Sequence, residues 1–307
     1  MAEESQQQEP DPDYLTDEEY EAAAGDDVAR DVEYGEAGTD YTQAFLRSQT
    51  PLLGAGRWQV DFGVQYTIFE FDTPTLVGAN LTELNLTSRR IHTPIGLRYG
   101  VSNRLQLFAA TTLGWQQSQL FNGFNEATQD VGGIGDVTTG FNYLWCQETA
   151  CNPSVIATWD VTAPTGNPQN PLFLSDAGLG SGVWATSLRL LMVKTYDPLV
   201  IFWGGGYRFT FEDDFGANQV DIGDQILYNA GVGFAVNERV TLSTAFIGSY
   251  VTDLEVNGVG LNGTDFDLAS IRMAATIARC GRITEPFVEF GLTERSPSAS
   301  FGVQFTR

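Results

Sequence analysis

The chain has 307 residues, with 39 acidic residues against 16 basic ones and a formal net charge of −23 at pH 7. Because a polyphosphate ligand needs a basic face, this composition argues against nucleic acid as a partner. Hydrophobic residues make up 42% and charged residues 18%, while glycine (33 residues), phenylalanine (20) and tyrosine (11) are abundant. The profile is not that of a helical protein, and no apolar run approaches the ~18 residues that a membrane-spanning helix needs.

The acidic charge is concentrated at the N-terminus. Residues 1–40 hold 15 of the acidic residues and only one basic residue, Arg30. The segment is rich in Glu, Gln, Asp and Pro and poor in apolar side chains, so it cannot bury enough surface to offset the entropy of ordering. Its composition therefore predicts a largely disordered acidic tail.

From Trp58 onward the chain alternates between apolar and polar side chains with a period of two. Trp58, Val60 and Phe62 begin one face, whereas Gln59 and Asp61 begin the other. Such alternation predicts a strand with one apolar and one polar face. The pattern recurs and predicts twelve strands, at residues 58–68, 84–99, 104–115, 134–145, 154–165, 183–194, 199–211, 222–236, 240–252, 266–279, 285–293 and 298–305.

Short turns alternate with mostly longer loops, so the long loops all fall at one end of the predicted strands. Outer-membrane β-barrels have this arrangement, with short periplasmic turns, long external loops and periplasmic termini. Tryptophan and tyrosine fall at both strand ends, where membrane barrels carry aromatic girdles. The short turns are 100–103, 146–153, 195–198, 237–239 and 280–284; the longer loops are about 69–83, 116–133, 166–182, 212–221 and 253–265; the aromatic residues are Trp58, Tyr99, Trp145 and Trp203 at short turns and Trp115, Trp184 and Tyr250 at long loops.

These features predict an all-β protein, a 12-stranded antiparallel transmembrane β-barrel over residues 57–307 preceded by the disordered acidic tail. The alternative is a large soluble β-sandwich or lipocalin-like barrel. That fold would have to pack twelve apolar faces into one interior, whereas lipid accepts them without a packing constraint. Residues 41–56 form a linker that either lies in the periplasm or enters the barrel as a plug. The expected location is the bacterial outer membrane, with the N- and C-termini periplasmic.

Three stretches carry a resemblance to a known family: FLRSQTPLLGAGRWQVDFGVQY (45–66), GIGDVTTGFNYLW (133–145) and TAPTGNP (162–168). They resemble the putative outer-membrane proteins named for the meta-pathway of phenol degradation, which are grouped with fatty-acid-transporter-like barrels. The resemblance extends over most of residues 45–307. It implies an outer-membrane barrel that passes small apolar or aromatic molecules, and it implies no catalytic residue.

If the apolar faces meet lipid, the alternate residues line the lumen, and twelve strands predict a narrow pore or a small ligand cavity. Two interpretations of the lumenal charges stay open. Arginine–carboxylate pairs brace the wall and fill the lumen, or a surplus of arginine forms a constriction that favours anionic or carboxylated solutes. The predicted lumen-lining residues are Asp61, Arg90, His92, Arg98, Arg104, Asp136, Asp160, Arg189, Arg208, Arg272 and Glu289.

The chain offers little for catalysis or metal binding. His92 is the only histidine, and its polar-face neighbours Arg90 and Pro94 supply no nucleophile, so we expect no enzymatic activity. The spacing of Cys146 and Cys151 within one short turn permits a disulfide without requiring it. We expect no metal site, because three cysteines and a distant histidine lack the usual ligand spacing, and no cofactor.

Two functions fit these observations. The first is a channel or transporter for small, aromatic or hydrophobic molecules through a narrow lumen. Uptake of apolar solutes would use a glycine kink or bulge in a wall strand, for which Gly204-Gly205-Gly206 is the candidate, although this run would equally suit packing against a bulky neighbour. The second is an outer-membrane anchor or assembly protein whose acidic tail binds a basic periplasmic protein. Membrane lipid and a small solute are the expected partners, and a homo-oligomer is a further option that the sequence does not decide.

Overall fold

The structure is a computed structural model that describes most of the chain beyond residue 51. The predicted acidic tail, and the predicted linker up to residue 51, lie outside the described residues. Among the residues that are described, no helix is long and apolar enough to cross a lipid bilayer. The described residues are 52–77, 80–121, 125–172, 176–279 and 281–307.

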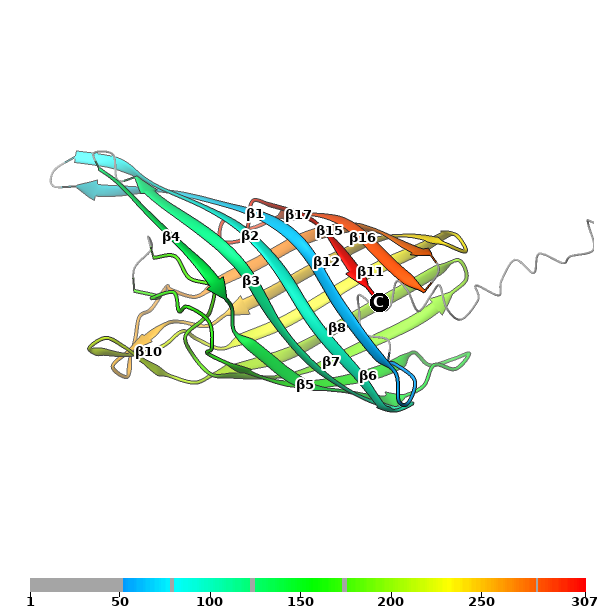
Figure 1. Ribbon diagram of the computed structural model, residues 1–307. Coiled ribbons are helices and arrows are strands. Elements are labelled where there is room, and N and C mark those ends of the chain that lie inside the picture. The colour runs from blue at the N-terminus through cyan, green and yellow to red at the C-terminus, as the bar shows by residue number, and fades with distance from the viewer. Residues whose placement is uncertain (1–51, 78–79, 122–124, 173–175, 280) are drawn as a thin grey trace, which may run out of the picture. The chain divides into compact units, whose positions relative to one another are not determined.

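Twelve antiparallel strands of the described chain form the wall of a barrel (Figure 1). The last of them, β17 (Ala299–Thr306), closes the ring by pairing with the first, β1 (Trp58–Val77). The predicted all-β, twelve-stranded antiparallel barrel is therefore confirmed. The other wall strands are β2 (Asn80–Ser102), β3 (Leu105–Phe121), β5 (Val137–Cys146), β6 (Ser154–Ala163), β7 (Ala185–Tyr196), β8 (Leu199–Thr210), β11 (Gln225–Asn237), β12 (Val240–Val251), β15 (Phe266–Arg279) and β16 (Arg282–Gly291).

Five further strands of the described chain lie outside this ring. β4 (Glu126–Ile134) pairs with the part of β3 that continues beyond β5. Four short strands in the long connections form a small separate sheet: β9 (Asp213–Phe215), β10 (Asn218–Asp221), β13 (Glu255–Val256) and β14 (Val259–Gly260).

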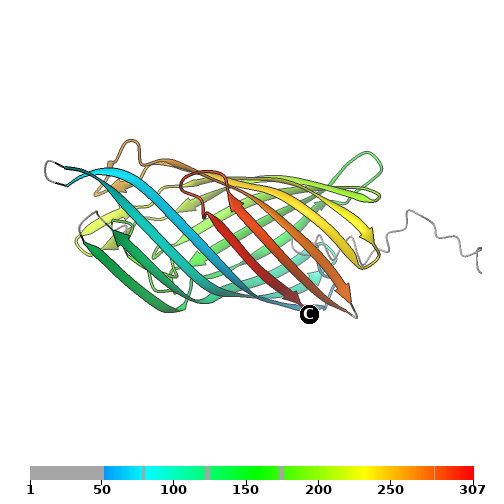
Figure 2. The same cartoon turned by 90° about the horizontal axis from the view of Figure 1, so that it is seen from above.

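The first three wall strands are longer than predicted, and the expected loops at 69–83 and 116–133 are wrong. The β1–β2 hairpin continues to the pair Val77–Asn80, well past the last residue of β1 that pairs with β17. It projects beyond the ring at the long-loop end (Figures 1 and 2). The outward positions Glu70 and Asp72 are acidic and exposed, which suits a hairpin that has left the lipid band. The sequence interpretation mistook this loss of outward apolar residues for the end of the strand.

The outward face of the ring is apolar and exposed. Phe62 on β1 and Leu188 on β7 are each about half exposed. Trp58 and Trp145 stand at the short-turn ends and are 64% and 69% exposed, and Trp184 stands at the long-loop end. An apolar band flanked by aromatic rings is the surface that meets a bilayer. It argues against the soluble alternative, in which these faces would be buried inside.

The inward face is polar, and ion pairs between neighbouring strands cross it. Arg272 of β15 lies 3.1 Å from Glu285 of β16, measured from Nη2 to Oε1. Thr276 Oγ1 donates to the other oxygen of Glu285 at 3.0 Å, and the Arg272 guanidinium lies 3.8 Å from the centroid of the Phe287 ring. Arginine guanidinium groups suit such packing because they pair with carboxylates and stack on aromatic faces at once. Two other pairs brace the wall in the same way, Arg98–Asp61 and Arg189–Asp160.

The ion pair between β15 and β16 gives a test of this bracing. We expect Glu285→Ala to lower the free energy of unfolding by about 3–5 kcal/mol, because it leaves Arg272 inside the barrel without its buried acceptor. Glu238→Ala removes a carboxylate from the exposed β11–β12 turn and should stay within about 0.5 kcal/mol of the parent chain. Urea titration of the folded barrel in detergent, followed by the heat-modifiable shift on gels, measures both. Equal stability of the two variants would contradict a bracing role for Glu285.

Candidate functional site

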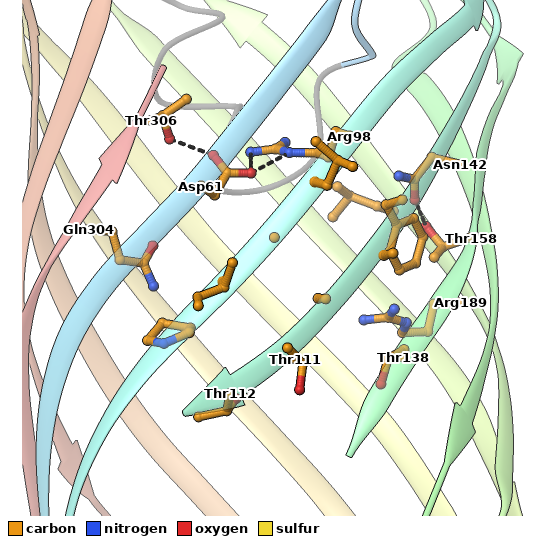
Figure 3. Close-up of a pocket in the computed structure, with 18 of the residues that line it drawn as sticks. Asp61, Arg98, Thr111, Thr112, Thr138, Asn142, Thr158, Arg189, Gln304 and Thr306 are labelled. Carbon is orange, nitrogen blue, oxygen red and sulfur yellow. Dashed lines mark hydrogen bonds and ion pairs between the residues drawn. The ribbon is translucent and has the colours of Figure 1, made fainter. Parts of the chain in front are cut away.

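A cavity of about 630 Å³ lies in the barrel lumen (Figure 3). Charged, polar and apolar side chains of several strands line it together. Cavities of this volume hold small molecules, and a mixed lining of this kind orients them. The charged and polar lining residues include Asp61, Arg98, Thr138, Asn142, Thr158 and Arg189, and the apolar ones include Phe108, Leu191, Leu227 and Ile247.

Hydrogen bonds link polar lining residues of neighbouring strands. Asp61 accepts hydrogen bonds from Arg98 Nε at 2.7 Å, from Thr306 Oγ1 at 2.6 Å and from Gln59 Nε2 at 3.2 Å. One carboxylate therefore links β1, β2 and β17 at the seam where the barrel closes. Charge-assisted bonds of this kind are the stronger class of hydrogen bond, so Asp61 holds this wall of the cavity rigidly.

Inward-facing glycines of β8 leave room for the side chains beside them. A Cβ atom at Gly206 would lie only 2.5 Å from Cγ of Arg189, and one at Gly204 only 2.9 Å from Oδ1 of Asn229, so a larger residue would clash at either position. The run Gly204-Gly205-Gly206 pairs in regular register with β7 and β11. It is a packing site for bulky neighbours, and the alternative of a kink at this position is wrong.

Part of the short-turn end of the lumen is occupied by the segment before β1. The backbone N–H of Leu53 donates to Oε1 of Gln106 at 2.9 Å, and both residues are buried. The described part of the predicted linker thus runs along the mouth of the barrel, where Gly56 also donates to the carbonyl of Gly100 at 2.7 Å. Nearby strand ends contribute an apolar cluster formed by Val193, Val200, Phe202 and Ala245.

The wall is broken on its long-loop side between β4 and β6. β4 and β5 both pair with β3, and Gly135 and Asp136 separate them. β6 follows β5 only as far as the pair Val137–Ala163. Beyond this pair, toward the long loops, one edge of β4 pairs with β3, and the other edge pairs with no strand in the described part of the chain. An open sheet edge leaves backbone N–H and C=O groups unpaired unless other protein groups cover it, and the segment that follows β6 lies here.

The described residues 164–172 and 176–182 cover the break, and Asp136 holds them there. Its carboxylate accepts from the backbone N–H of Gly166 at 3.1 Å, and from the N–H and hydroxyl of Ser181 at 2.7 and 2.8 Å. A Cβ atom at Gly180 would lie 2.4 Å from Oδ1 of Asp136. Inside the lumen, Arg90 of β2 donates to the carbonyl of Gly178 at 3.4 Å. We call residues 164–172 and 176–182 together the wall loop, since they complete the wall and reach the lumen.

The predicted lumen-lining residues fall into three groups. Asp61, Arg98, Asp136 and Arg189 line the cavity. Arg104 is the exception to the lumenal set, because it precedes β3 and is exposed in the turn after β2. The other six lie at inward strand positions but are not among the residues that line the cavity: Arg90, His92, Asp160, Arg208, Arg272 and Glu289.

Two residues add details that the sequence does not give. Nδ1 of His92 is buried without a partner among the described residues. Glu285, which pairs with Arg272, was not in the predicted set, because β16 begins at Arg282 rather than at Glu285 itself. Its spacing of four from Glu289 puts both carboxylates on one face and could have identified it.

The cysteine turn is held without a disulfide. Cys146 and Cys151 are free and exposed, and Cys280 lies outside the described residues. The turn is fixed instead by Lys194, whose ammonium donates to the carbonyls of Thr149 and Ala150 and lies 3.5 Å from Glu148. Within the described ranges no group of three or more His, Cys, Asp or Glu side chains is arranged to hold a metal ion.

Comparison with solved structures shows a fold shared with a known channel. The COG4313 outer membrane channel from Pseudomonas putida F1 superposes with a TM-score of 0.67 at 18% identity, covering 83% of this chain and 96% of that one. The translocator domain of the autotransporter NalP from Neisseria meningitidis gives 0.48 at 12% identity, covering 89% and 99%. The Pseudomonas putida toluene transporter TodX gives 0.44 at 11% identity, covering 89% and 93%. At these identities only the fold is shown, and it rests on the first of the three.

Comparison of the sequence with family profiles gives one match. The family described as "Putative MetA-pathway of phenol degradation" matches residues 34–271. This range covers the described N-terminal strands, the break in the wall and most of the cavity lining. The chain therefore belongs to the family of putative MetA-pathway of phenol degradation proteins, and it has the fold of an outer-membrane channel.

Proposed function

We propose that the chain is an outer-membrane channel that admits small hydrophobic or amphipathic molecules through the lumenal cavity. The family description points to aromatic compounds as the first solutes to consider, and the outward apolar band suits a barrel set in lipid. Both termini would then be periplasmic, since β1 begins and β17 ends at the end that carries the short turns.

The observation that carries the proposal is that the cavity reaches the break in the wall. Asp136 lines the cavity and also holds the wall loop in the break. An apolar solute that crosses the wall here would pass between lipid and cavity without entering the polar water phase above the barrel. Movement of the wall loop would be enough to open that route, because no barrel strand has to separate from its partner.

The lumen is too full for a wide aqueous pore. The Leu53 segment and the apolar cluster occupy part of the short-turn end, and the wall loop reaches into the other end. We therefore expect single-channel conductance in planar bilayers to be small, far below that of the sixteen- to eighteen-stranded porins, whose lumen is an aqueous channel. A large, weakly selective current from the purified chain would contradict the narrow lumen.

The anchor hypothesis depends on residues 1–40, which lie outside the described residues. We expect deletion of residues 1–40 to leave solute uptake by cells unchanged, because the cavity and the break in the wall are built from later residues. Uptake of radiolabelled toluene and pull-down of periplasmic proteins measure the two functions side by side. Lost uptake after the deletion would show that the tail takes part in transport.

Release of the wall loop gives the sharpest test of the lateral route. We expect Asp136→Ala to speed the initial uptake of labelled toluene by cells, because the loop loses three hydrogen bonds to a carboxylate, each of about 1.5–3 kcal/mol. Asp130→Ala is the matched control, since Asp130 is exposed on β4 and its side chain has no hydrogen bond or ion pair within the described chain. Uptake by the Asp136 variant at or below the control rate, with equal amounts of folded barrel, would contradict this route.

A further inference from the structure

One lumenal arginine differs from the others. Arg98, Arg189 and Arg272 pair with carboxylates, and Arg90 donates to Gln116 and to the wall loop. Within the described part of the chain the guanidinium of Arg208 has neither a hydrogen bond nor an ion pair, and its Nε is buried. Burying a charged donor without an acceptor is unfavourable. An external acceptor would remove that cost.

The neighbours of Arg208 explain why it has no partner. Arg208 pairs across the strands with Ser187 of β7, which in turn pairs with Asp160 of β6. Oδ2 of Asp160 already accepts from Ser187 Oγ at 2.6 Å and from Arg189 Nη2 at 2.7 Å. The oxygens of Asp136 hold the wall loop. Asp160 and Asp136 therefore bond to other groups, and neither accepts a hydrogen bond from Arg208 within the described part of the chain.

Arg208 lies beside the part of the wall that carries Arg189. It is the next inward residue of β8 after Gly206, and Gly206 pairs with Arg189. The Arg189 side chain is 47% exposed and lines the cavity (Figure 3). Apolar residues lie close to Arg189. Gly206 of β8 pairs with Arg189 on one neighbouring strand and with Leu227 on the other. Two residues along β8, Gly204 pairs with Leu191 and Asn229, and Asn229 pairs in turn with Ile247. The two arginines and the apolar side chains of Leu191, Leu227 and Ile247 thus lie on the same part of the barrel wall.

We propose that Arg208, assisted by Arg189, binds the carboxylate of a solute whose apolar body lies on Leu191, Leu227 and Ile247. A carboxylate suits the site because a guanidinium fork pairs with its two oxygens. The inference rests on the proposed channel function and narrows its solute class, from small hydrophobic molecules in general to aromatic or aliphatic carboxylates.

Binding of three probes to the purified full-length chain in lipid nanodiscs tests the proposal. Benzoate carries both the ring and the carboxylate, acetate carries only the carboxylate, and benzylammonium carries the ring with the opposite charge. Calorimetry at pH 7 should show benzoate binding at least about tenfold more tightly than either of the others, the change expected from one charge-assisted hydrogen bond. Equal affinity for benzoate and benzylammonium, or no benzoate binding at all, would overturn the proposal.

Variants then assign the effect to Arg208. Arg208→Gln should weaken benzoate binding about tenfold or more and leave benzylammonium unchanged, while Arg208→Lys should recover part of the loss because it keeps the charge. Arg239→Gln, in the exposed β11–β12 turn, is the matched control and should bind benzoate like the parent. The heat-modifiable gel shift shows whether each variant is folded. A folded Arg208→Gln chain with the affinity of the parent would overturn the assignment.

Uptake of labelled benzoate into proteoliposomes separates this inference from the channel function. Faster entry than into protein-free liposomes, reduced in Arg208→Gln but not in Arg239→Gln, supports both. Arg208-dependent binding without entry would leave the carboxylate site standing and contradict the channel function. Faster uptake of toluene by cells that carry the chain, combined with no binding of benzoate, would support the channel and overturn the carboxylate site.

Discussion

The structure depends on one constraint: within lipid, every backbone N–H and C=O group needs a partner from the protein itself. Closure between β1 and β17 meets it around most of the ring. The exception is the stretch where β6 stops and β4 continues alone along β3. There the wall loop and the carboxylate of Asp136 take over from a strand. Side-chain bonds are easier to exchange than a continuous ladder, so this is the part of the wall at which the proposed lateral route would open.

The same constraint orders the lumen. Neighbouring strands place their inward residues in rows, so a charge on one strand meets a partner on the next. Asp61–Arg98, Asp160–Arg189 and Glu285–Arg272 all join adjacent strands. These pairs occupy part of the interior and brace the wall around the cavity. Arg208 stands apart from this scheme because Asp160 is already bonded to Ser187 and Arg189.

Much of the fold was predictable because the side-chain period of a strand is a local property. The alternation from Trp58 identified the first strand, and the lengths of the connections identified the two ends of the barrel. The register between strands is not local, so the partner of Arg272 and the missing partner of Arg208 could not be read from the sequence. Glycines show the limit most clearly. The conspicuous run at Gly204–Gly206 packs within a regular ladder, whereas the separate residues Gly135, Gly166 and Gly180 meet at the break.

The β1–β2 hairpin has a consequence for how such molecules coexist in a crowded membrane. Phe69–Val77 adds nine residues beyond the ring, which is roughly 30 Å of strand at about 3.3 Å per residue. A ribbon of this length exposes unpaired backbone along its edge, and free edges attract other strands. The acidic side chains of Glu70 and Asp72 lie where that edge begins. Two copies that approach edge to edge would bring like charges together, so the projecting ribbon is protected from aggregation by its own carboxylates.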